Sequence, residues 1–558
     1  MAQGTAKLRK RRAREAEARE ARAANGAAAA QVSVAKSRFQ FTGWQWACLG
    51  LLAGAAILRL FELAAKVLHH DEGVNGLFMT NLFRNGYYHY DPSNYHGPTL
   101  YYAGLVTTTV NAIFYGKYGL STFAVRLVTA VFGIALVWLF LCLRRQLGTF
   151  GAFSAGVLAA VSSGLVFFSR YFIHEILFVF FTLGVVVAVL WYQETRQPKY
   201  LFLAAASLAM LGATKETWII TVAVWLLALL CTQAWMYLRR RGREEPAAKR
   251  ARPAPAPNTS PASLPAEEPW SQAQLYITAA AVFVAVWVLF YSSFFTNFPQ
   301  GVYDSVRTFT YWFKTGRTDD LADYWTYLKW LVWRMPAGDF RPGAELAAMA
   351  LGFLGTITAL AKAQSRFAVF TAFWSLGMLA AYSLVPYKTP WLALSIVTPF
   401  IVMAGYFLQQ MYEDWRLKAF AVVLLAAAAV GSLYQAIDTS FWSYDDENQT
   451  YSYAHSKRDL LNLVDEVERI AAGNAAGKNI GITVMANEHW PLPWYFREYP
   501  HAGFYGKVVP TSEPMAIVHE SQMSDAVRTL GDNYRLFSVH VLRPGNRLYL
   551  FLRKDVQP

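Results

Sequence analysis

Cysteine is scarce in this 558-residue chain, which has only Cys48, Cys142 and Cys231, each within an apolar run. Three scattered thiols are too few for a zinc site or a disulfide framework. Charged residues are also few, at 16% of the chain, whereas apolar residues make up 55% and the mean hydropathy is positive. Apolar runs of about 20 residues recur, which is the length that crosses the hydrocarbon core of a bilayer. The composition therefore predicts a multi-span membrane protein rather than a soluble enzyme.

Acidic residues are outnumbered, with 37 Asp and Glu against 51 Lys and Arg, so the formal net charge is +14. In a soluble protein this excess would indicate nucleic acid as a partner. Here much of it lies in two flanking segments, and retention of positive charge on the cytoplasmic side explains it without nucleic acid. The N-terminus also lacks the features of a signal peptide, because its first apolar run, about 44–63, is too long and has no small-x-small exit. We expect a basic tail followed by an uncleaved span.

Eleven apolar runs predict eleven transmembrane helices. They lie at about 44–64, 122–143, 150–168, 176–193, 199–214, 217–238, 274–295, 345–362, 366–385, 391–410 and 417–436. Lys and Arg in short loops stay on the cytoplasmic side and so orient the spans. With the N-terminus inside, each basic loop also falls inside: Arg144-Arg145, Arg196 with Lys199, Arg239-Arg240-Arg241, Lys362 with Arg366, and Arg416 with Lys418. The stretch 98–115 is apolar but contains three threonines in a row and an asparagine, so we interpret it as a helix at the membrane interface.

The spans divide the chain into five regions. These are a cytoplasmic basic tail at 1–43; a membrane catalytic module at 44–238 with a first outer loop at 65–121; a cytoplasmic linker at 239–273; a second membrane module at 274–439 with an outer loop at 297–344; and an extracytoplasmic domain at 440–558. The linker is rich in proline and has no apolar period, which predicts disorder. Within the second outer loop, apolar residues from Tyr324 to Val332 recur at helical spacing, which indicates an interfacial amphipathic helix.

The last region is polar, with a helix-like stretch at 457–472 and short apolar runs at 480–485 and 548–552. This pattern predicts a small α/β domain. The fold class is therefore a polytopic α-helical membrane protein of about eleven spans with a small C-terminal extracytoplasmic α/β domain. We expect it in the cell inner (plasma) membrane, with its N-terminus in the cytoplasm.

Four polar clusters fall at span boundaries on the predicted outer face. They are His69-His70-Asp71-Glu72-Gly73, Ser169-Arg170-Tyr171-Phe172-Ile173-His174-Glu175, Lys215-Glu216, and Pro386-Tyr387-Lys388-Thr389-Pro390-Trp391. A single boundary charge is more often an interface residue than a functional one, but clusters that converge on one face indicate a site. Carboxylates beside histidine act as a general base or bind a divalent metal. Lys215, Arg170 and Lys388 could meet a phosphate. These residues fit transfer from a phosphate-activated donor, and they also fit a proton-coupled transporter.

The order of motifs resembles the opening of the glycosyltransferase C superfamily, which includes the protein O-mannosyltransferases and the lipid A aminoarabinose transferases. The motifs are Arg59; His70-Asp71-Glu72-Gly73; Tyr95-His96-Gly97-Pro98-Thr99-Leu100-Tyr101-Tyr102; Ala124-Val125-Arg126-Leu127; Ser169-Arg170 with Glu175; and Thr214-Lys215-Glu216. More narrowly, the chain looks like a prokaryotic family named for association with flippase activity in protein glycosylation. Its C-terminal signature is similar to Glu488-His489-Trp490-Pro491-Leu492-Pro493-Trp494-Tyr495-Phe496-Arg497, and the resemblance covers about 44–510.

The resemblance implies an inverting transferase of a hexosyl or related sugar, with a polyprenyl-phosphate-linked donor. Carried over, Asp71 takes the acceptor proton, Glu72 assists, and Glu175 holds acceptor, phosphate or metal. The predicted substrate-binding residues are His70, His96, Arg170, His174, Glu175, Lys215, Glu216, Tyr387 and Lys388. Because His174 departs from the simple acidic pattern, a divalent metal held by Glu175 and His174 stays open. The expected partners are the lipid-linked sugar, membrane lipids and other glycosylation enzymes.

Three functions remain open from the sequence: a glycosyltransferase, a transporter or flippase component of a glycosylation pathway, and a non-catalytic scaffold. Inverted repeats with paired broken helices would favour a transporter, and none is evident. Trp490 and Trp494 could form the core of a small domain, stack on sugar, or cap the cleft. The glycosylation sequon at Asn448 is a match of low value.

Overall fold

The computed structural model describes residues 41–94, 96–248, 270–315, 323–334, 341–386 and 388–557. Most of the predicted basic tail and the predicted substrate-binding residue Tyr387 therefore lie outside the described residues. The chain divides into two units, residues 1–50 and 51–558. All contacts discussed below lie within the second unit.

Eight helices of the described residues are long and apolar enough to cross a membrane. They are α2 (Gly43–Leu60), α5 (Thr122–Cys142), α9 (Glu175–Thr195), α11 (Trp218–Ala248), α12 (Gln272–Tyr291), α16 (Arg366–Leu384), α17 (Ala393–Glu413, preceded by η2 at Pro390–Leu392) and α18 (Lys418–Ile437). Three shorter apolar helices are α7 (Thr149–Val161), α10 (Pro198–Gly212) and α15 (Leu346–Lys362). Each of the eleven predicted spans thus contains one apolar helix, and the predicted fold class is confirmed.

One predicted span is broken. The run 150–168 forms α7 and then α8 (Ser163–Phe168), with Ser162 between them. The Ser162 hydroxyl accepts a hydrogen bond from Leu165 N and donates one to buried Glu345, which also accepts from Gly164 N. These side chains satisfy backbone groups that the break leaves without helical partners.

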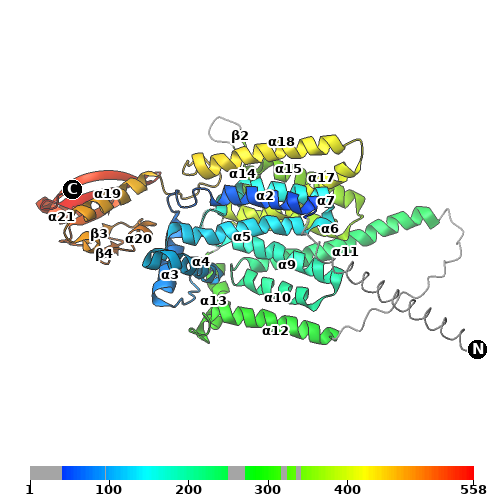
Figure 1. The fold of residues 1–558 in the computed structure, drawn as a ribbon, viewed down its shortest axis with the longest axis horizontal. Helices are drawn as coiled ribbons and strands as arrows, with labels where there is room; N and C mark the ends of the chain where they lie inside the picture. The colour runs from blue at the N-terminus through cyan, green and yellow to red at the C-terminus, as the bar shows by residue number, and fades with distance from the viewer. Residues whose placement is uncertain are drawn as a thin grey trace, which may run out of the picture. The chain divides into compact units, whose positions relative to one another are not determined.

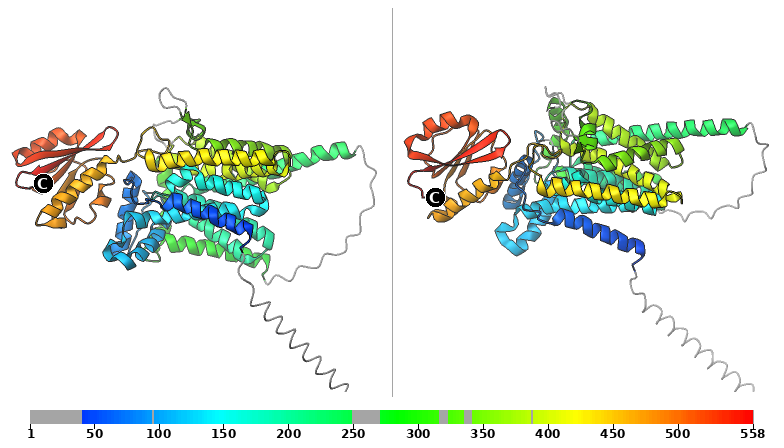
Figure 2. Two further views of the ribbon diagram at one scale, coloured as in Figure 1. Left: turned by 45° about the horizontal axis from the view of Figure 1, so that its top comes forward. Right: turned by 90° about the horizontal axis from the view of Figure 1, so that it is seen from above.

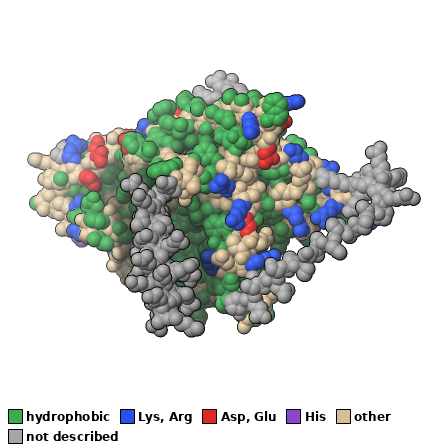
Figure 3. Space-filling model, turned by 45° about the vertical axis from the view of Figure 1, so that its right-hand side comes forward, with side chains coloured by type: hydrophobic (Ala, Val, Ile, Leu, Met, Phe, Trp, Pro, Cys, Tyr) green, Lys and Arg blue, Asp and Glu red, His purple; other side chains and the backbone are tan. Residues whose placement is uncertain are grey.

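Helices α3 (His70–Asn85) and α4 (Thr99–Tyr115) lie at the same end of the bundle as the C-terminal sheet (Figures 1 and 2). Helix α4 is the predicted interface helix. It buries Leu100 and Tyr101 against the protein and exposes Val106 and Ile113, as expected for a helix with one face toward lipid. Lys and Arg side chains outnumber acidic ones on the end of the bundle that Figure 3 brings forward, away from the sheet. The predicted orientation would place this end of the bundle in the cytoplasm.

Two other segments differ from expectation. Helix α11 continues to Ala248, ten residues into the predicted linker, because Arg, Glu and Ala favour helix where the chain leaves the apolar run. Residues 249–269 lie outside the described residues. The second outer loop contains α13 (Gln300–Thr315), α14 (Thr326–Val332) and a two-stranded sheet of β1 (Trp333–Arg334) and β2 (Arg341–Pro342). The predicted amphipathic helix is thus the short α14, whose apolar residues Tyr327 and Leu331 are fully buried in the protein.

The C-terminal region folds around a five-stranded mixed sheet in the order β4-β3-β5-β7-β6. The strands are β3 (Ile482–Met485), β4 (Ala502–Tyr505), β5 (Met515–His519), β6 (Tyr534–Arg543) and β7 (Asn546–Arg553), and the helices are α19 (Asp459–Gly473), α20 (Leu492–Tyr495) and α21 (Met523–Leu530). Strands β4, β3 and β5 pair in parallel, and β7 pairs antiparallel with both β5 and β6. Strand β3 is buried along its whole length, which explains its continuous apolar sequence. The remaining short helices are η1 (Gly116–Gly119), α6 (Arg144–Leu147), η3 (Asp438–Trp442), η4 (Gly477–Asn479), η5 (Glu520–Gln522) and η6 (Gly531–Asn533).

Candidate active site

Asp71 lies at the second residue of α3, where the helix begins after the loop that follows α2. Its side chain is 43% exposed. The residue before the helix, His69, caps it: His69 Nδ1 accepts from Asp71 N at 3.1 Å, and the Glu72 carboxylate accepts from His69 N at 3.0 Å. The positive end of the helix dipole favours a carboxylate at this position. Asp71 is therefore an anion on an ordered turn, open to solvent or to a ligand.

Glu72, the next residue, is buried and fully hydrogen-bonded. Arg126 donates to both of its oxygens at 2.7 Å, and the backbone N–H groups of Phe172 and His69 donate at 2.9 and 3.0 Å. Burial acts to raise the pKa of Glu72, but the charge and hydrogen bonds of Arg126 outweigh it and the pKa is lowered. A carboxylate with four donors has little capacity left to take a proton. The geometry fits a positioning residue better than the predicted assistant in proton transfer.

Arg126, on α5, connects this carboxylate to the loop after α2. Besides binding Glu72 it donates to the carbonyl oxygens of Leu63, Lys66 and Val67 at 3.0–3.3 Å. The resemblance had pointed to this arginine, but the residue types alone gave it no role. Its contacts show that it holds both the loop and the start of α3 against α5.

Lys66 is a buried cation that the sequence analysis missed. Among the residues that the structure describes, its Nζ has no hydrogen-bond partner, and it lies 4.1 Å from the ring centroid of Tyr171 and 4.5 Å from that of Phe167. Burial lowers the pKa of Lys66 well below its ordinary value, and the nearby charges of Arg170 and Arg126 lower it further. In the sequence, only the position of Lys66, five residues before Asp71 in the same loop, could have indicated that it lies near the site.

Five predicted residues meet where the loop before α4 contacts the turn between α10 and α11. Lys215 Nζ donates to Glu175 at 2.6 Å, and His96 Nδ1 lies 3.0 Å from Glu216. Burial lowers the pKa of Lys215, but Glu175 and Glu216 outweigh this and raise it. Burial likewise raises the pKa of Glu216, whereas His96 and Lys215 bring it below its usual range. The predicted convergence of these clusters is therefore present in the structure.

His174, the fifth residue of this group, faces the backbone. Its Nε2 lies 3.0 Å from the carbonyl oxygen of Gly97. Burial lowers its pKa well below the usual value, with His96 and Lys215 adding to the effect, so the ring is neutral and donates from Nε2. Gly97 is required here, because a side chain at this position would collide with the backbone of Ala213.

These contacts bear on the open question of a metal. In the described ranges, no group of three or more His, Cys, Asp or Glu side chains could hold a metal ion. His174 donates to a carbonyl and Glu175 accepts from a lysine, so this pair does not fit the ligand role considered for it.

Arg170 and Lys388, two cations predicted to bind phosphate, donate to carbonyl oxygens at the ends of helices. Arg170 donates to the carbonyl oxygens of Leu58, Arg59, Phe61 and Glu62 at the end of α2, at 2.6–3.2 Å. Lys388 donates to those of Tyr382, Ser383 and Val385 at the end of α16, at 2.7–3.2 Å. The last carbonyls of a helix lack helical partners and attract cations. Both side chains therefore donate to backbone in this structure, and their contact with substrate stays a prediction.

The segment 490–497 of the C-terminal region packs onto α3. A side chain on Gly73 would come within 2.6 Å of Pro491, and one on Gly76 would collide with the Trp494 ring. Tyr495 accepts from Leu68 N at 2.9 Å, and Trp494 Nε1 donates to Thr122 at 3.2 Å. Trp494 is thus buried between the C-terminal region and the first outer loop, so this region packs directly on α3.

Arg543, at the end of β6, makes a second contact with α3. Its Nη2 donates to His70 Nδ1 at 3.1 Å and to the Trp490 carbonyl at 2.7 Å, while Nη1 donates to Glu488 at 2.8 Å. Burial lowers the pKa of His70, which keeps Nδ1 free to accept. Predicted residue His70 thus connects the two regions, and Arg543, a single arginine on a strand, carried no signal in the sequence.

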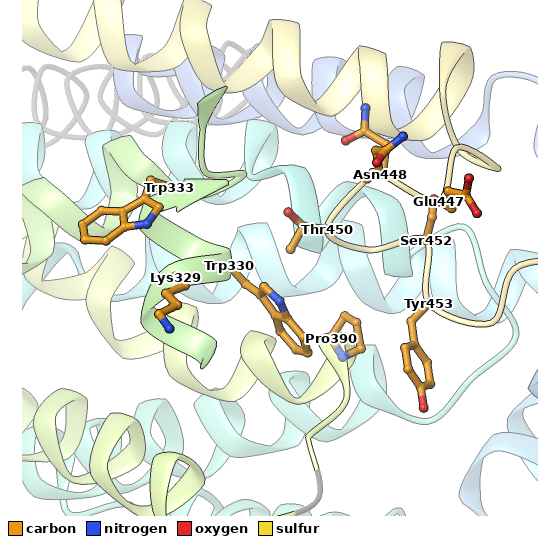
Figure 4. Close-up of a pocket in the computed structure, with 10 residues that line it drawn as sticks. Lys329, Trp330, Trp333, Pro390, Glu447, Asn448, Thr450, Ser452 and Tyr453 are labelled. Carbon is orange, nitrogen blue, oxygen red and sulfur yellow. The ribbon is translucent and has the colours of Figure 1, made fainter. Parts of the chain in front are cut away.

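Two neighbouring cavities lie beside this contact. The first, of about 560 Å³, is lined by Lys329, Trp330, Trp333, Pro390, Glu447, Asn448, Gln449, Thr450, Ser452 and Tyr453 (Figure 4). The second, of about 530 Å³, is lined by Asp445, Glu447, Ser452, Tyr453, Ala454, His455, Glu488, Arg543, Pro544 and Asn546. Glu447, Ser452 and Tyr453 line both, so the cavities adjoin.

Comparisons with known proteins agree with this architecture. Residues 94–251 match the dolichyl-phosphate-mannose-protein mannosyltransferase family. No curated protein sequence matches the chain. Among solved structures, ArnT from Cupriavidus metallidurans bound to undecaprenyl phosphate has 13% identity and a TM-score of 0.64, over 93% of this chain and 100% of that one.

The same protein in the apo state has 13% identity and a TM-score of 0.59, over 90% of this chain and 97% of that one. At this identity the likeness shows the fold. It covers 93% of this chain, and the family match falls on the segment that contains His96, Glu175 and Lys215. The chain therefore has the glycosyltransferase C fold, as its motifs predicted.

Proposed function

We propose that this protein is a membrane glycosyltransferase that moves a sugar from a polyprenyl-phosphate-linked donor to an acceptor hydroxyl. The observation that carries the proposal is the environment of Asp71. Asp71 presents a carboxylate that is 43% exposed, on a turn that the ion pair of Glu72 with Arg126 holds in place. The glycosyltransferase C fold and the undecaprenyl phosphate bound to ArnT support a lipid-linked donor.

Asp71 acts as general base in this proposal. It takes the proton of the acceptor hydroxyl while that oxygen attacks the anomeric carbon of the donor sugar. The bond from the anomeric carbon to the phosphate oxygen breaks, and the lipid phosphate leaves with the electron pair. Direct displacement inverts the anomeric centre, as the sequence resemblance implied.

Lys215 is the cation proposed to stabilise the leaving phosphate. Arg170 and Lys388 give their donors to helix carbonyls, whereas Lys215 donates one of its three N–H groups to Glu175. Tyr101 lies between the cluster around Lys215 and the helix that carries Asp71. Its hydroxyl donates to Asn75 on α3 at 2.8 Å, and its ring centroid lies 5.6 Å from that of His174. Fixed cations aimed at developing charge lower the barrier to transfer.

The proposed site faces outward. The loop charges predict that the end of the bundle with α3 lies outside the cell membrane, and Figures 1 and 2 place the C-terminal sheet at that same end. A lipid-linked donor would enter laterally from the bilayer.

The test uses the purified full chain in liposomes with a polyprenyl-phosphate hexose and a membrane extract as the source of acceptor. Release of free polyprenyl phosphate and appearance of a glycosylated product, both absent in Asp71→Asn, are expected. Movement of the labelled donor between leaflets without its consumption would support a flippase component instead. If neither occurs and the protein co-purifies with active glycosylation enzymes, the result would support a non-catalytic scaffold instead of a transferase.

A further inference from the structure

The two neighbouring cavities share three lining residues, and together we call them the outer groove, which is defined by the lining residues given above. One wall is α14 with the segment at Pro390, and the other is the loop 445–455 (Figure 4). Hydrogen bonds to the preceding residues hold the loop: Ser452 donates to the Tyr444 carbonyl at 2.6 Å, and Gln449 donates to Asp438 at 2.6 Å. The groove is thus formed in advance of any ligand, as binding sites usually are.

Flat aromatic side chains line the groove. Trp330 and Trp333 come from α14 and β1, and Tyr453 comes from the opposite loop. Trp333 and Tyr453 are 40% and 44% exposed, although both are large side chains that normally gain by burial. An exposed aromatic face in a cavity offers a stacking surface to a ligand with an apolar face of similar size.

Uncharged and acidic oxygen groups provide most of the remaining lining. They are Asp445, Glu447, Asn448, Gln449, Thr450, Ser452, Glu488 and Asn546. Carboxylates and amides accept hydrogen bonds from hydroxyls, and amides also donate. Such groups beside aromatic faces suit a molecule with hydroxyls around its edge and C–H groups on its faces.

The charges of the groove disfavour an anionic ligand. Its two cations are already paired, Arg543 with Glu488 at 2.8 Å and Lys329 with Asp323. Asp445 is paired with Arg458 at 3.1 Å, but Glu447 is exposed with no ion pair among the described residues. A phosphate would have to break one of these pairs and would lie close to Glu447.

The groove contacts the start of α3 through two of its lining residues. Tyr453 contributes its carbonyl oxygen 2.8 Å from His69 Nε2, and Arg543 donates to His70 Nδ1 at 3.1 Å. His69 and His70 are the two residues before Asp71. Residues that line the groove therefore contact the turn that carries the proposed base.

We propose that the outer groove binds the acceptor and that this acceptor is a neutral oligosaccharide. The sugar rings stack on Trp330 and Tyr453, their hydroxyls bond to Glu447 and the neighbouring amides, and the terminal hydroxyl points toward Asp71. The assignment rests on the proposed function for the fate of that hydroxyl, but binding itself needs no donor.

The experiment measures binding to the detergent-purified full chain by isothermal titration calorimetry. The probes are maltotetraose, α-mannotetraose and tetra-N-acetylchitotetraose, with glucose 6-phosphate and a Ser/Thr-rich decapeptide as competitors. At least one tetrasaccharide is expected to bind, with affinity reduced about tenfold in Trp330→Ala and by about threefold to tenfold in Glu447→Gln. Trp415→Ala, at a tryptophan that is 74% exposed in the turn after α17, is the matched control and is expected to bind as the wild type does.

Absence of binding by all three tetrasaccharides would overturn the inference. So would unchanged binding in both groove variants, or displacement of the sugar by the decapeptide or by glucose 6-phosphate. Asp71→Asn separates this inference from the proposed function, since it should abolish transfer and leave tetrasaccharide binding intact. Binding without any transfer by the wild type would refute the transferase and retain the groove.

Discussion

The start of α3 carries two carboxylates in opposite surroundings. Glu72 is buried and accepts four hydrogen bonds, two from Arg126, whereas the Asp71 side chain is 43% exposed and lies 4.0 Å from His69 Nδ1. At the other cluster, buried Glu175 and Glu216 resemble Glu72, because they are paired with Lys215 and His96. These closely paired carboxylates hold the outer loops in place, and the more exposed Asp71 is the one proposed for chemistry. The acidic motifs of this chain therefore combine carboxylates in structural pairs with the one that is proposed to react.

The largest effect on stability is expected from Glu72→Gln. Removing one partner of a buried ion pair leaves Arg126 uncompensated, which costs about 3–5 kcal/mol. Thermal unfolding of the detergent-purified protein measures the loss. Glu498→Gln removes a partly exposed pair with Arg84 and is the matched control, expected to cost less than about 1 kcal/mol. Equal stability of the two variants would contradict the structural role of Glu72.

Trp494→Ala should be next in size, because the ring is buried against Gly76 between the C-terminal region and α3. Loss of a buried tryptophan costs about 3 kcal/mol or more. We also expect transfer to fall, since α3 would no longer be held where Asp71 meets the groove. Trp442, which is 59% exposed, provides the control Trp442→Ala. Normal transfer by Trp494→Ala would show that docking of the C-terminal region does not position α3.

Lys388→Met distinguishes a helix cap from a phosphate ligand. The three carbonyls at the end of α16 would lose their donor, at a cost of about 2 kcal/mol. The KM for the lipid-linked donor should stay unchanged in steady-state assays. A large rise in KM with normal stability would restore the role predicted from the sequence.

The smallest effect is a pH dependence. The folded-state pKa of Glu72 lies below its ordinary value of 4.5, because Arg126 outweighs burial. Such a group contributes stability that is present above the unfolded pKa and lost as pH falls through the folded one. The stability difference between the wild type and Glu72→Gln should therefore be constant down to about pH 5 and narrow at lower pH. A difference that persists unchanged at the lowest accessible pH would show that charge on Glu72 is not its source.

Much of the fold follows from apolar runs and loop charges. All eleven predicted spans contain an apolar helix, and the runs at 480–485 and 548–552 became β3 and β7. The break at Ser162 and the helical start of the linker were not predicted, because each depends on local capping or propensity that overrides the pattern.

Prediction of the site was less complete, for a definite physical reason. Residue type and span position placed Glu175, Lys215 and Glu216 on one face, and the family resemblance added His96. Neither showed which charged side chains would bind the carbonyl oxygens at helix ends. Arg170 was therefore interpreted as a ligand when it caps α2. Arg543 and Lys66 act through contacts made only in the folded chain, and nothing in their neighbours along the sequence indicates those contacts.

Asp71→Asn, measured for both transfer and thermal stability, tests the central claim most directly. The account predicts that transfer from a polyprenyl-phosphate sugar falls at least about a hundredfold, the usual contribution of a general base. It also predicts a melting temperature close to that of the wild type, since the Asp71 side chain is 43% exposed and its contact with His69 Nδ1 is long, at 4.0 Å. An active Asp71→Asn protein, or one that loses activity only because it unfolds, would contradict the assignment of Asp71 as the base.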